Sequence, residues 1–288
     1  MNARRGQTDR LISTIWPWTA SNRLNSGKII AMKLRFPVLP VLPLAALFLC
    51  FGAAAGESVD LSERVPREPL VRIDNMRGEV EIRGWNRDEV TVSGELDDLA
   101  EGITFDVDGR DVRIEVRMPR SDVNWGDGSD LVIRLPVASR VSFKGVSTDV
   151  AIEGVDGGVG VGTVSGDIEV EDVSGQLLVN SVSGDVEVTG VKSRTSVSTI
   201  SGDIEINSAG RELKVETVSG DVEVELDAFE RLNGRSVSGS LELSGRLLED
   251  GRIDLGSVSG DIRLDLATPI NAELEIHGPA SAAISTTT

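Results

Sequence analysis

The fold is decided by the stretch TVSGDIEVEDVSGQLLVNSVSGDVEV, residues 163–188, in which one phrase occurs twice. The triplet Ser-Gly-Asp at residues 165–167 returns eighteen residues later at 183–185, and again at 201–203 and 219–221. A repeat of this length is typical of architectures in which each unit contacts only its neighbours. The repeat therefore predicts a stack of similar units rather than a single globular core.

Apolar residues around each triplet recur every nine residues. Val159, Val161 and Val164 form an h-x-h-x-x-h pattern, which Ile168, Val170 and Val173 repeat. The columns eighteen residues apart are Ile168, Val186, Ile204 and Val222; Val170, Val188, Ile206 and Val224; and Val164, Val182, Ile200 and Val218. Acidic residues alternate with the first two columns, as in a strand with one buried face. We therefore predict an all-β fold, a β-solenoid with coils of about 18 residues and two main strands per coil.

The period also predicts the domain boundaries. The solenoid is expected over residues 138–268, although its coils lengthen to nineteen residues before Ser238 and twenty-one before Ser259. Residues 56–137 are rich in strand patterns without the strict period, so we predict an irregular N-terminal β capping region that covers the first coil. Residues 269–288 form a C-terminal tail, which is either a fraying cap or a last coil that meets a partner.

The beginning of the chain has the pattern of an export signal. Residues 32–55 combine a basic start, an apolar stretch and the small residues 53–55, which predicts a signal peptide cleaved after Ala55. Residues 1–31 are then an upstream extension or a long n-region. Prolines interrupt the apolar stretch, which disfavours an uncleaved membrane anchor. We expect an exported protein, in the periplasm or on the cell surface. Its only cysteine, Cys50, lies within the signal, so no disulfide is expected.

The charge of the chain limits its partners. The formal net charge is −18, and a surface of this sign disfavours nucleic acid, whose phosphates require clustered Lys and Arg. An envelope or extracellular protein or glycan is the expected partner, and self-association through the coil ends is a further option. The expected interaction surface is the broad strand face that carries Glu169, Glu187, Glu205, Glu223 and Glu242.

The repeated Ser-Gly-Asp has a structural and a chemical interpretation. In the structural one, glycine supplies an unusual backbone angle at a corner while Asp or Ser bonds nearby amides. The corner glycines are Gly166, Gly184, Gly202, Gly220, Gly239 and Gly260. In the chemical one, a ladder of Asp167, Asp185, Asp203 and Asp221 binds calcium. We predict corners, since these residue types are those that turns require, and keep the calcium ladder as the alternative.

The sequence predicts no catalytic or cofactor-binding residues. Its only histidine, His277, lies in the weakly patterned C-terminal part, an unpromising place for the base of a Ser-His-Asp site. Carboxylate pairs abound, and a sugar-cleaving enzyme uses two of them, but no Tyr or Trp follows Trp125 to hold a substrate. We therefore expect a non-enzymatic binding or structural module. A carbohydrate-active β-helix enzyme and a calcium-stabilised scaffold are the alternative functions.

The repeated phrases VSGDIEV, VSGDVEV, ISGDIEI and VSGDIRL, with the leader strand NMRGEVEIRGW, resemble the bacterial putative-adhesin family. The likeness covers roughly residues 68–268. It implies an all-β Gly-Asp repeat domain of unknown function, exported or membrane-associated, with an adhesin-like role in the cell envelope. The family offers no catalytic residues to transfer. The sequence departs from its motif at Thr148 and Ser240, where Gly or Asp is replaced.

Overall fold

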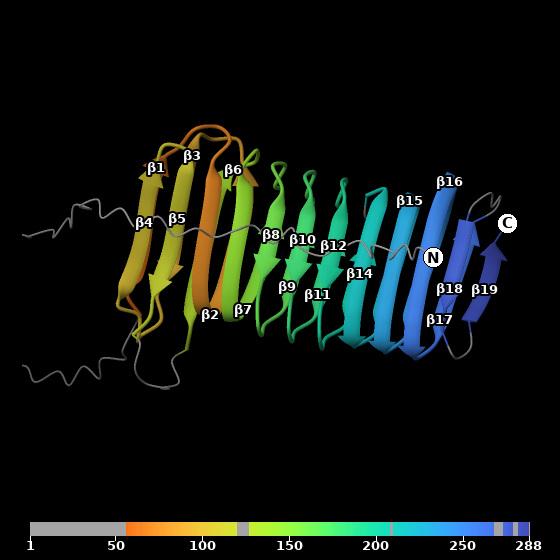
Figure 1. The fold of residues 1–288 in the computed structure, drawn as a ribbon. Coiled ribbons are helices and arrows are strands. Elements are labelled where there is room, and N and C mark those ends of the chain that lie inside the picture. The colour runs from red at the N-terminus through yellow and green to blue at the C-terminus, as the bar shows by residue number, and fades with distance from the viewer. Residues whose placement is uncertain (1–55, 120–126, 208–209, 268–272, 279–281, 288) are drawn as a thin grey trace, which may run out of the picture. The chain divides into compact units, whose positions relative to one another are not determined.

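Period-two alternation of apolar and polar residues produces strands throughout this chain. The computed structural model describes residues 56–119, 127–207, 210–267, 273–278 and 282–287, which form β-strands and turns (Figure 1). The predicted signal peptide, its cleavage site after Ala55 and residues 1–31 lie outside the described residues. No helix in the described part of the chain is long and apolar enough to cross a membrane.

The strands fall into an N-terminal group and a repeat group. The N-terminal strands are β1 (Ser58–Arg64), β2 (Leu70–Trp85), β3 (Glu89–Glu95), β4 (Gly102–Asp108), β5 (Asp111–Arg117) and β6 (Ser129–Pro136). The repeat strands are β7 (Arg140–Glu153), β8 (Val159–Gly162), β9 (Ile168–Glu171), β10 (Leu177–Asn180), β11 (Val186–Thr189), β12 (Thr195–Ser198), β13 (Ile204–Asn207), β14 (Glu212–Ser219), β15 (Val222–Ser238), β16 (Leu241–Ser259), β17 (Ile262–Ala267), β18 (Glu273–His277) and β19 (Ala282–Thr287).

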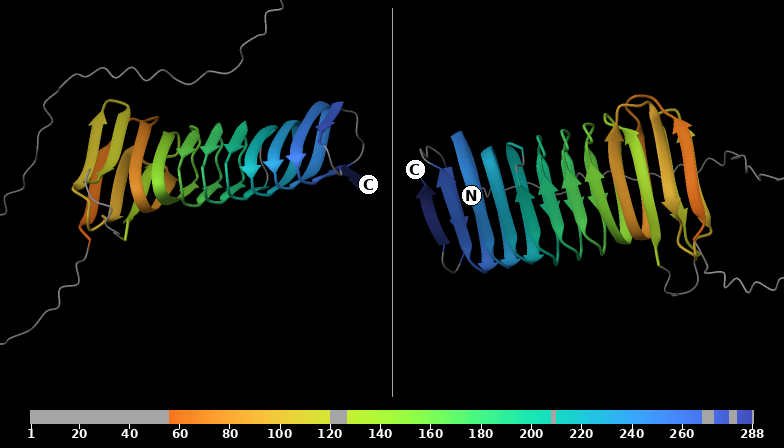
Figure 2. Two further views of the ribbon diagram at one scale, coloured as in Figure 1. Left: turned by 60° about the horizontal axis from the view of Figure 1, so that its bottom comes forward. Right: turned by 180° about the vertical axis from the view of Figure 1, so that it is seen from behind.

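Each coil of the repeat adds one strand to each of two parallel stacks. In the first stack, β8, β10, β12 and β14 pair in this order, with Leu177 opposite Val159 on one side and Thr195 on the other. In the second stack, β9, β11, β13 and β15 pair so that Val186 lies between Ile168 and Ile204. Figures 1 and 2 show the coils succeeding one another in this order. The predicted β-solenoid with 18-residue coils is confirmed.

The later coils are longer, and the extra residues lie at one corner. Ser219 is opposite Ser238, and Ser238 is opposite Ser259, so the spacing of nineteen and twenty-one residues keeps this corner in register. The pairing of β15 with β16 instead shifts on either side of Phe229, at the other corner. Phe229 is buried there together with Leu226, which fills the wider turn. Strands β18 and β19, within the expected tail, continue the two stacks by parallel pairing with β16 and β17.

The N-terminal strands join the stack out of chain order. Strand β2 pairs in parallel with β7 on one side and with β5 and β6 on the other, so it forms a coil between segments that follow it in sequence. Strands β1, β3 and β4 then add by antiparallel pairing. Parallel coils thus extend into the range expected to be an irregular cap. Their period was hidden because partners in β2 and β5, such as Leu70 and Asp111, are not eighteen residues apart.

A buried ion pair fastens these N-terminal strands to the corner of β2. Arg77 donates from both Nε and Nη2 to the carboxylate of Asp97, whose side chain is fully buried, and the Nη2–Oδ1 distance is 3.0 Å. Burial acts to raise the pKa of Asp97, but the hydrogen bonds from Arg77 and the Leu99 amide outweigh it, so that the pKa lies below its ordinary value. The same bond raises the pKa of Arg77.

Glycine is required at the corner between the two stacks. Gly184 has φ of +126°, and a Cβ built on it would lie 2.2 Å from the carbonyl oxygen of Gly166 in the preceding coil. Gly78 occupies the same corner in β2, with φ of +105° and a would-be Cβ 2.2 Å from the Ser129 oxygen. Any side chain there would push neighbouring coils apart, which would break their hydrogen bonds.

The first prediction concerns this contact. Gly184→Ala should lower the free energy of unfolding by about 3 kcal/mol or more, because the new methyl group meets backbone that cannot swing aside. The matched control is Gly160→Ala in β8, where a Cβ would meet nothing nearer than the Val141 oxygen at 3.9 Å. It should change stability by about 0.5 kcal/mol or less. Urea unfolding followed by circular dichroism measures both, and equal losses in the two variants would contradict the role of the corner.

Candidate functional site: an acidic face and its corner

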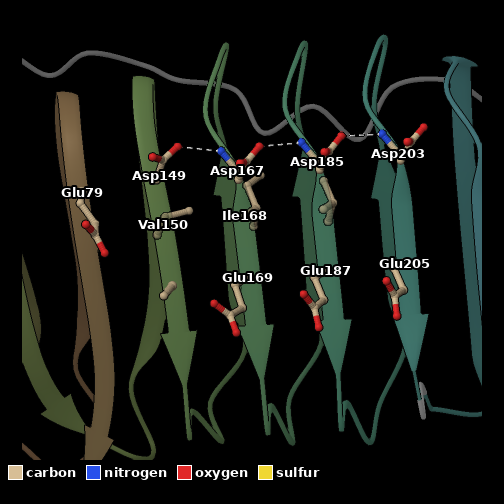
Figure 3. Close-up of a pocket in the computed structure, with 12 residues that line it drawn as sticks. Glu79, Asp149, Val150, Asp167, Ile168, Glu169, Asp185, Glu187, Asp203 and Glu205 are labelled. Atoms are coloured by element: carbon tan, nitrogen blue, oxygen red, sulfur yellow. Dashed lines mark hydrogen bonds between the residues drawn. The ribbon is translucent and has the colours of Figure 1, made fainter.

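The outward side chains of the second stack are dominated by carboxylates. Because side chains alternate, the residues directly before the buried Ile168 column and those between it and the Val170 column point outward. We call nine of these residues the acidic face: Asp149, Asp167, Asp185, Asp203, Asp221, Glu169, Glu187, Glu205 and Glu223. The aspartates form one row at the corner and the glutamates a second row one step along the strands (Figure 3).

The aspartate row is a ladder of hydrogen bonds between coils. Oδ1 of Asp167 accepts the backbone N–H of Asp185 at 2.9 Å, and Oδ1 of Asp185 accepts that of Asp203 at the same distance. The ladder begins at Asp149 and ends where Oδ1 of Asp221 accepts the N–H of Ser240 at 2.8 Å. The sequence suggested that aspartate bonds nearby amides, and the structure shows that these amides belong to the next coil. Ser240 donates this last bond from its backbone N–H, which requires no carboxylate at position 240.

A shallow groove separates the two rows. Its volume is about 430 Å³, and its walls are formed by Asp149, Asp167, Asp185 and Asp203 on one side and by Glu169, Glu187 and Glu205 on the other (Figure 3). Glu79, which pairs with Asp149, lies at the β2 end of the groove. Its floor includes Val150, Ile168 and Val186. One oxygen of each ladder aspartate is used by an amide, which leaves the other oxygen free to face a ligand.

No residue of the acidic face forms an ion pair with any Lys or Arg in the described ranges. Among the described residues of this stack, ion pairs lie at its two ends: Arg83 contacts Glu81 and Glu153, and Arg263 contacts Glu242 at 2.6 Å. Glu242, one of the five glutamates expected in the interaction surface, is therefore neutralised, whereas the other four are not. The first stack differs, since Arg231 bridges to Glu212 and Lys214 to Glu216. Negative charge is thus concentrated on one side of the coils.

The aspartates of the acidic face stand in a row rather than in a cluster. Among the described residues, no group of three or more His, Cys, Asp or Glu side chains is placed to hold a metal ion. The calcium-ladder residues Asp167, Asp185, Asp203 and Asp221 stand in a row and each serves an amide. His277 lies in β18 of the first stack, exposed and 2.9 Å from Glu275, away from the groove. Burial raises the pKa of Asp74, but this residue also lies outside the groove.

A model of the Toastrack DUF4097 family matches residues 71–284. The chain belongs to this family. The sequence resemblance to an all-β domain family of unknown function agrees with this assignment. No curated protein matches the chain.

The solved structures that match this Toastrack domain share little sequence with it. A putative adhesin from Bacteroides fragilis NCTC 9343 is 17% identical, with a TM-score of 0.47, and the match covers 81% of this chain and 99% of that one. A putative adhesin from Parabacteroides distasonis ATCC 8503 is 12% identical, with a TM-score of 0.41 and coverage of 81% and 98%. A putative lipid binding protein from the same strain is 11% identical, with a TM-score of 0.32 and coverage of 81% and 98%.

The corner of this Toastrack domain also carries an exposed apolar column that sequence reasoning missed. The nine-residue pattern gives Val164 and Val173 the same place in the two halves of a coil, yet Val173 is buried and Val164 is 48% exposed. We call the exposed column the apolar ridge: Met76, Val146, Val164, Val182, Ile200, Val218, Val237 and Val258. The sequence does contain a signal for this column, because its residues in the repeat stand two positions before the corner, as Val164 stands before Gly166.

The second prediction tests the aspartate ladder. Asp185→Ala removes the acceptor of the Asp203 N–H and should lower the free energy of unfolding by about 1 kcal/mol. Asp185→Asn keeps an oxygen acceptor and removes one of a row of like charges, so its stability should equal or exceed that of the wild type. Glu187→Ala, two residues along in β11 and without a backbone partner for its carboxylate, is the matched control. Thermal unfolding measures all three, and an Asn variant as unstable as the Ala variant would contradict the ladder.

Proposed function

We propose that this chain is an exported, non-enzymatic binding module of the bacterial cell envelope whose acidic face engages cationic groups of a partner. The partner class is an envelope or extracellular protein or a glycan that carries amines or guanidinium groups. The observation that carries the proposal is the row of carboxylates without ion pairs on one side of the coils. The predicted export signal at residues 32–55 supports the location.

Electrostatics favours a cationic partner. Rows of carboxylates in successive coils stand about 4.8 Å apart, and each neighbouring pair repels by roughly 1 kcal/mol in water. Backbone amides satisfy one oxygen of each aspartate but bring no full positive charge to the glutamate row. A ligand with several cationic groups would relieve this repulsion along the whole groove. Such binding would weaken at high ionic strength, because the face is open to solvent.

The non-enzymatic part of the proposal rests on the placement of reactive groups. The groove contains carboxylates without a described histidine, lysine or arginine beside them, so no nucleophile and base converge there. A carbohydrate-active enzyme would overturn this part. Release of reducing ends or unsaturated products from envelope polysaccharides, abolished by a single change such as Glu187→Gln, would establish that activity.

The third prediction concerns export. When the full chain is expressed with a C-terminal tag in a bacterial host, the tag should appear in the periplasmic or surface fraction. The N-terminus of that product should be Gly56. Cell fractionation and N-terminal sequencing provide the measurement. An unprocessed chain that stays in the cytosol would contradict export, whereas binding by the acidic face would still be testable on the purified protein.

The fourth prediction concerns the acidic face. A ten-residue oligolysine should bind the purified protein at 50 mM salt, and ten-residue oligoglutamate should not. Glu187→Gln with Glu205→Gln should weaken the binding of oligolysine about fivefold, since two unpaired charges are lost. The matched control is Glu216→Gln with Glu275→Gln, two carboxylates of the first stack that pair with Lys214 and Arg252.

Isothermal titration calorimetry gives these affinities, and raising the salt to 0.5 M should weaken binding strongly. The control pair should change affinity by about twofold or less. If both pairs of substitutions weakened binding equally, the net charge of the protein rather than the acidic face would be responsible.

A further inference from the structure

The apolar ridge reverses the usual placement of residues at a strand end. A buried polar residue stands directly before each of the last six ridge residues: Thr163, Ser181, Thr199, Thr217, Ser236 and Ser257. Thr217 is 4% exposed while its neighbour Val218 is 44% exposed. Polar side chains thus point inward and apolar ones outward, coil after coil.

This reversal does not serve the stability of the isolated fold. The hydroxyl oxygens of Ser181, Thr199, Thr217, Ser236 and Ser257 have no hydrogen-bond partner in the structure. An unpaired buried hydroxyl and an exposed valine are each unfavourable. Strand propensity does not require the order either, since Thr and Val both favour extended backbone. Exchanging the two residues would bury the apolar group and expose the polar one, so the existing order points to a use for the exposed apolar side chains.

The ridge borders the acidic face. In the five coils from Val146 to Val218, as with Val164 and Asp167, the ridge residue stands three positions before an aspartate of the ladder. Val237 stands three positions before Ser240. An apolar line and a line of unpaired carboxylates therefore run side by side along the same corner. The complementary surface is an apolar stripe bordered by cations. An anionic lipid surface lacks those cations, and a second copy of this chain would bring its own carboxylates toward the contact.

The spacing of the ridge selects the conformation of the partner. Successive ridge residues lie about 4.8 Å apart, the distance between paired strands. Side chains on one face of an α-helix repeat about every 5.4 Å, whereas those on one side of a strand repeat about every 6.8 Å. The side chains of a helix laid along the corner therefore stay close to the ridge residues of four or five successive coils. The side chains of a strand fall out of register with the ridge after two coils. Four or five rungs correspond to a helix of roughly 15 residues.

We infer that the apolar ridge and the acidic face together form a docking surface for a basic amphipathic helix of a partner protein. The inference rests on the proposed binding function of the acidic face and adds the second half of its recognition. The ridge supplies contacts that persist at high salt, and the carboxylates orient the cationic border of the helix.

The test uses variants that separate binding from folding. Thr199→Val, Ile200→Thr, Thr217→Val and Val218→Thr are combined so that polar and apolar residues exchange places on two coils. This exchange variant should unfold at the same temperature as the wild type or higher. Val218→Thr alone is the second variant, should the exchange fail to fold. Leu178→Thr is the control, because Leu178 is 44% exposed but lies on the first stack, off the ridge.

The probes are two 18-residue peptides of identical Leu and Lys composition, one patterned as an amphipathic helix and one scrambled. At 0.15 M salt the patterned peptide should bind at least tenfold more tightly than the scrambled one and should gain helical circular dichroism on binding. The exchange variant should bind the patterned peptide about tenfold more weakly than the wild type and the scrambled peptide unchanged. Leu178→Thr should bind both peptides like the wild type.

Four results would overturn the inference. Equal affinity of the two peptides would mean that the acidic face acts alone, which leaves the proposed function standing. Dimerisation in sedimentation experiments that the exchange abolishes would assign the ridge to a second copy of the chain. Ridge-dependent binding to phosphatidylglycerol vesicles would assign it to a lipid surface. If neither peptide binds even at 50 mM salt, the proposed function fails together with the inference.

Discussion

The structure depends on direct backbone contact at the corner between successive coils. The carbonyl of one corner glycine lies where the next corner glycine would carry its Cβ, so neighbouring coils cannot slide or separate there without loss of contact. This contact fixes the register of every coil on the one before it, even where nineteen or twenty-one residues intervene. Because strand side chains alternate between two sides, a fixed register converts sequence positions into straight columns. The core, the acidic face and the apolar ridge are three such columns or groups of columns.

Within the acidic face, the aspartate row has a structural role that the glutamate row lacks. Each ladder aspartate gives one oxygen to the next coil and keeps the other toward solvent. The glutamates one step along the strand have no such backbone role. The aspartate row therefore stabilises the stack, whereas the glutamate row is available for the proposed binding of cations. This separation allows the charge of the glutamate row to vary without disturbing the corner.

The columns were predictable from the sequence because the repeat has a period of eighteen residues in which apolar and polar residues alternate. Such a repeat allows few alternative registers between successive coils. The buried Ile168 and Val170 columns and the corner position of Gly184 follow from that period alone. The place of β2 could not be predicted, since its pairing partners lie forty or more residues away and share no period with it. The exposure of Val164 was also beyond the pattern, because Val173 has the same sequence surroundings but lies at the other corner. Which corner turns its valine inward depends on backbone geometry that periodicity does not encode.

The position of β2 has a consequence for how the chain folds. Strand β2 pairs on both sides with segments that leave a ribosome or a membrane channel after it, up to residue 153. The coil of β2 is thus synthesised first but cannot pair until later strands have been made. Its pairing with those strands closes long loops, which costs conformational entropy. Beyond β7, each new coil finds its template already in place and can add locally, eighteen residues at a time. Folding should therefore nucleate slowly around β2 and then propagate quickly toward the C-terminus. Partly folded solenoids should be rare, because most molecules either lack the nucleus or have already added the later coils.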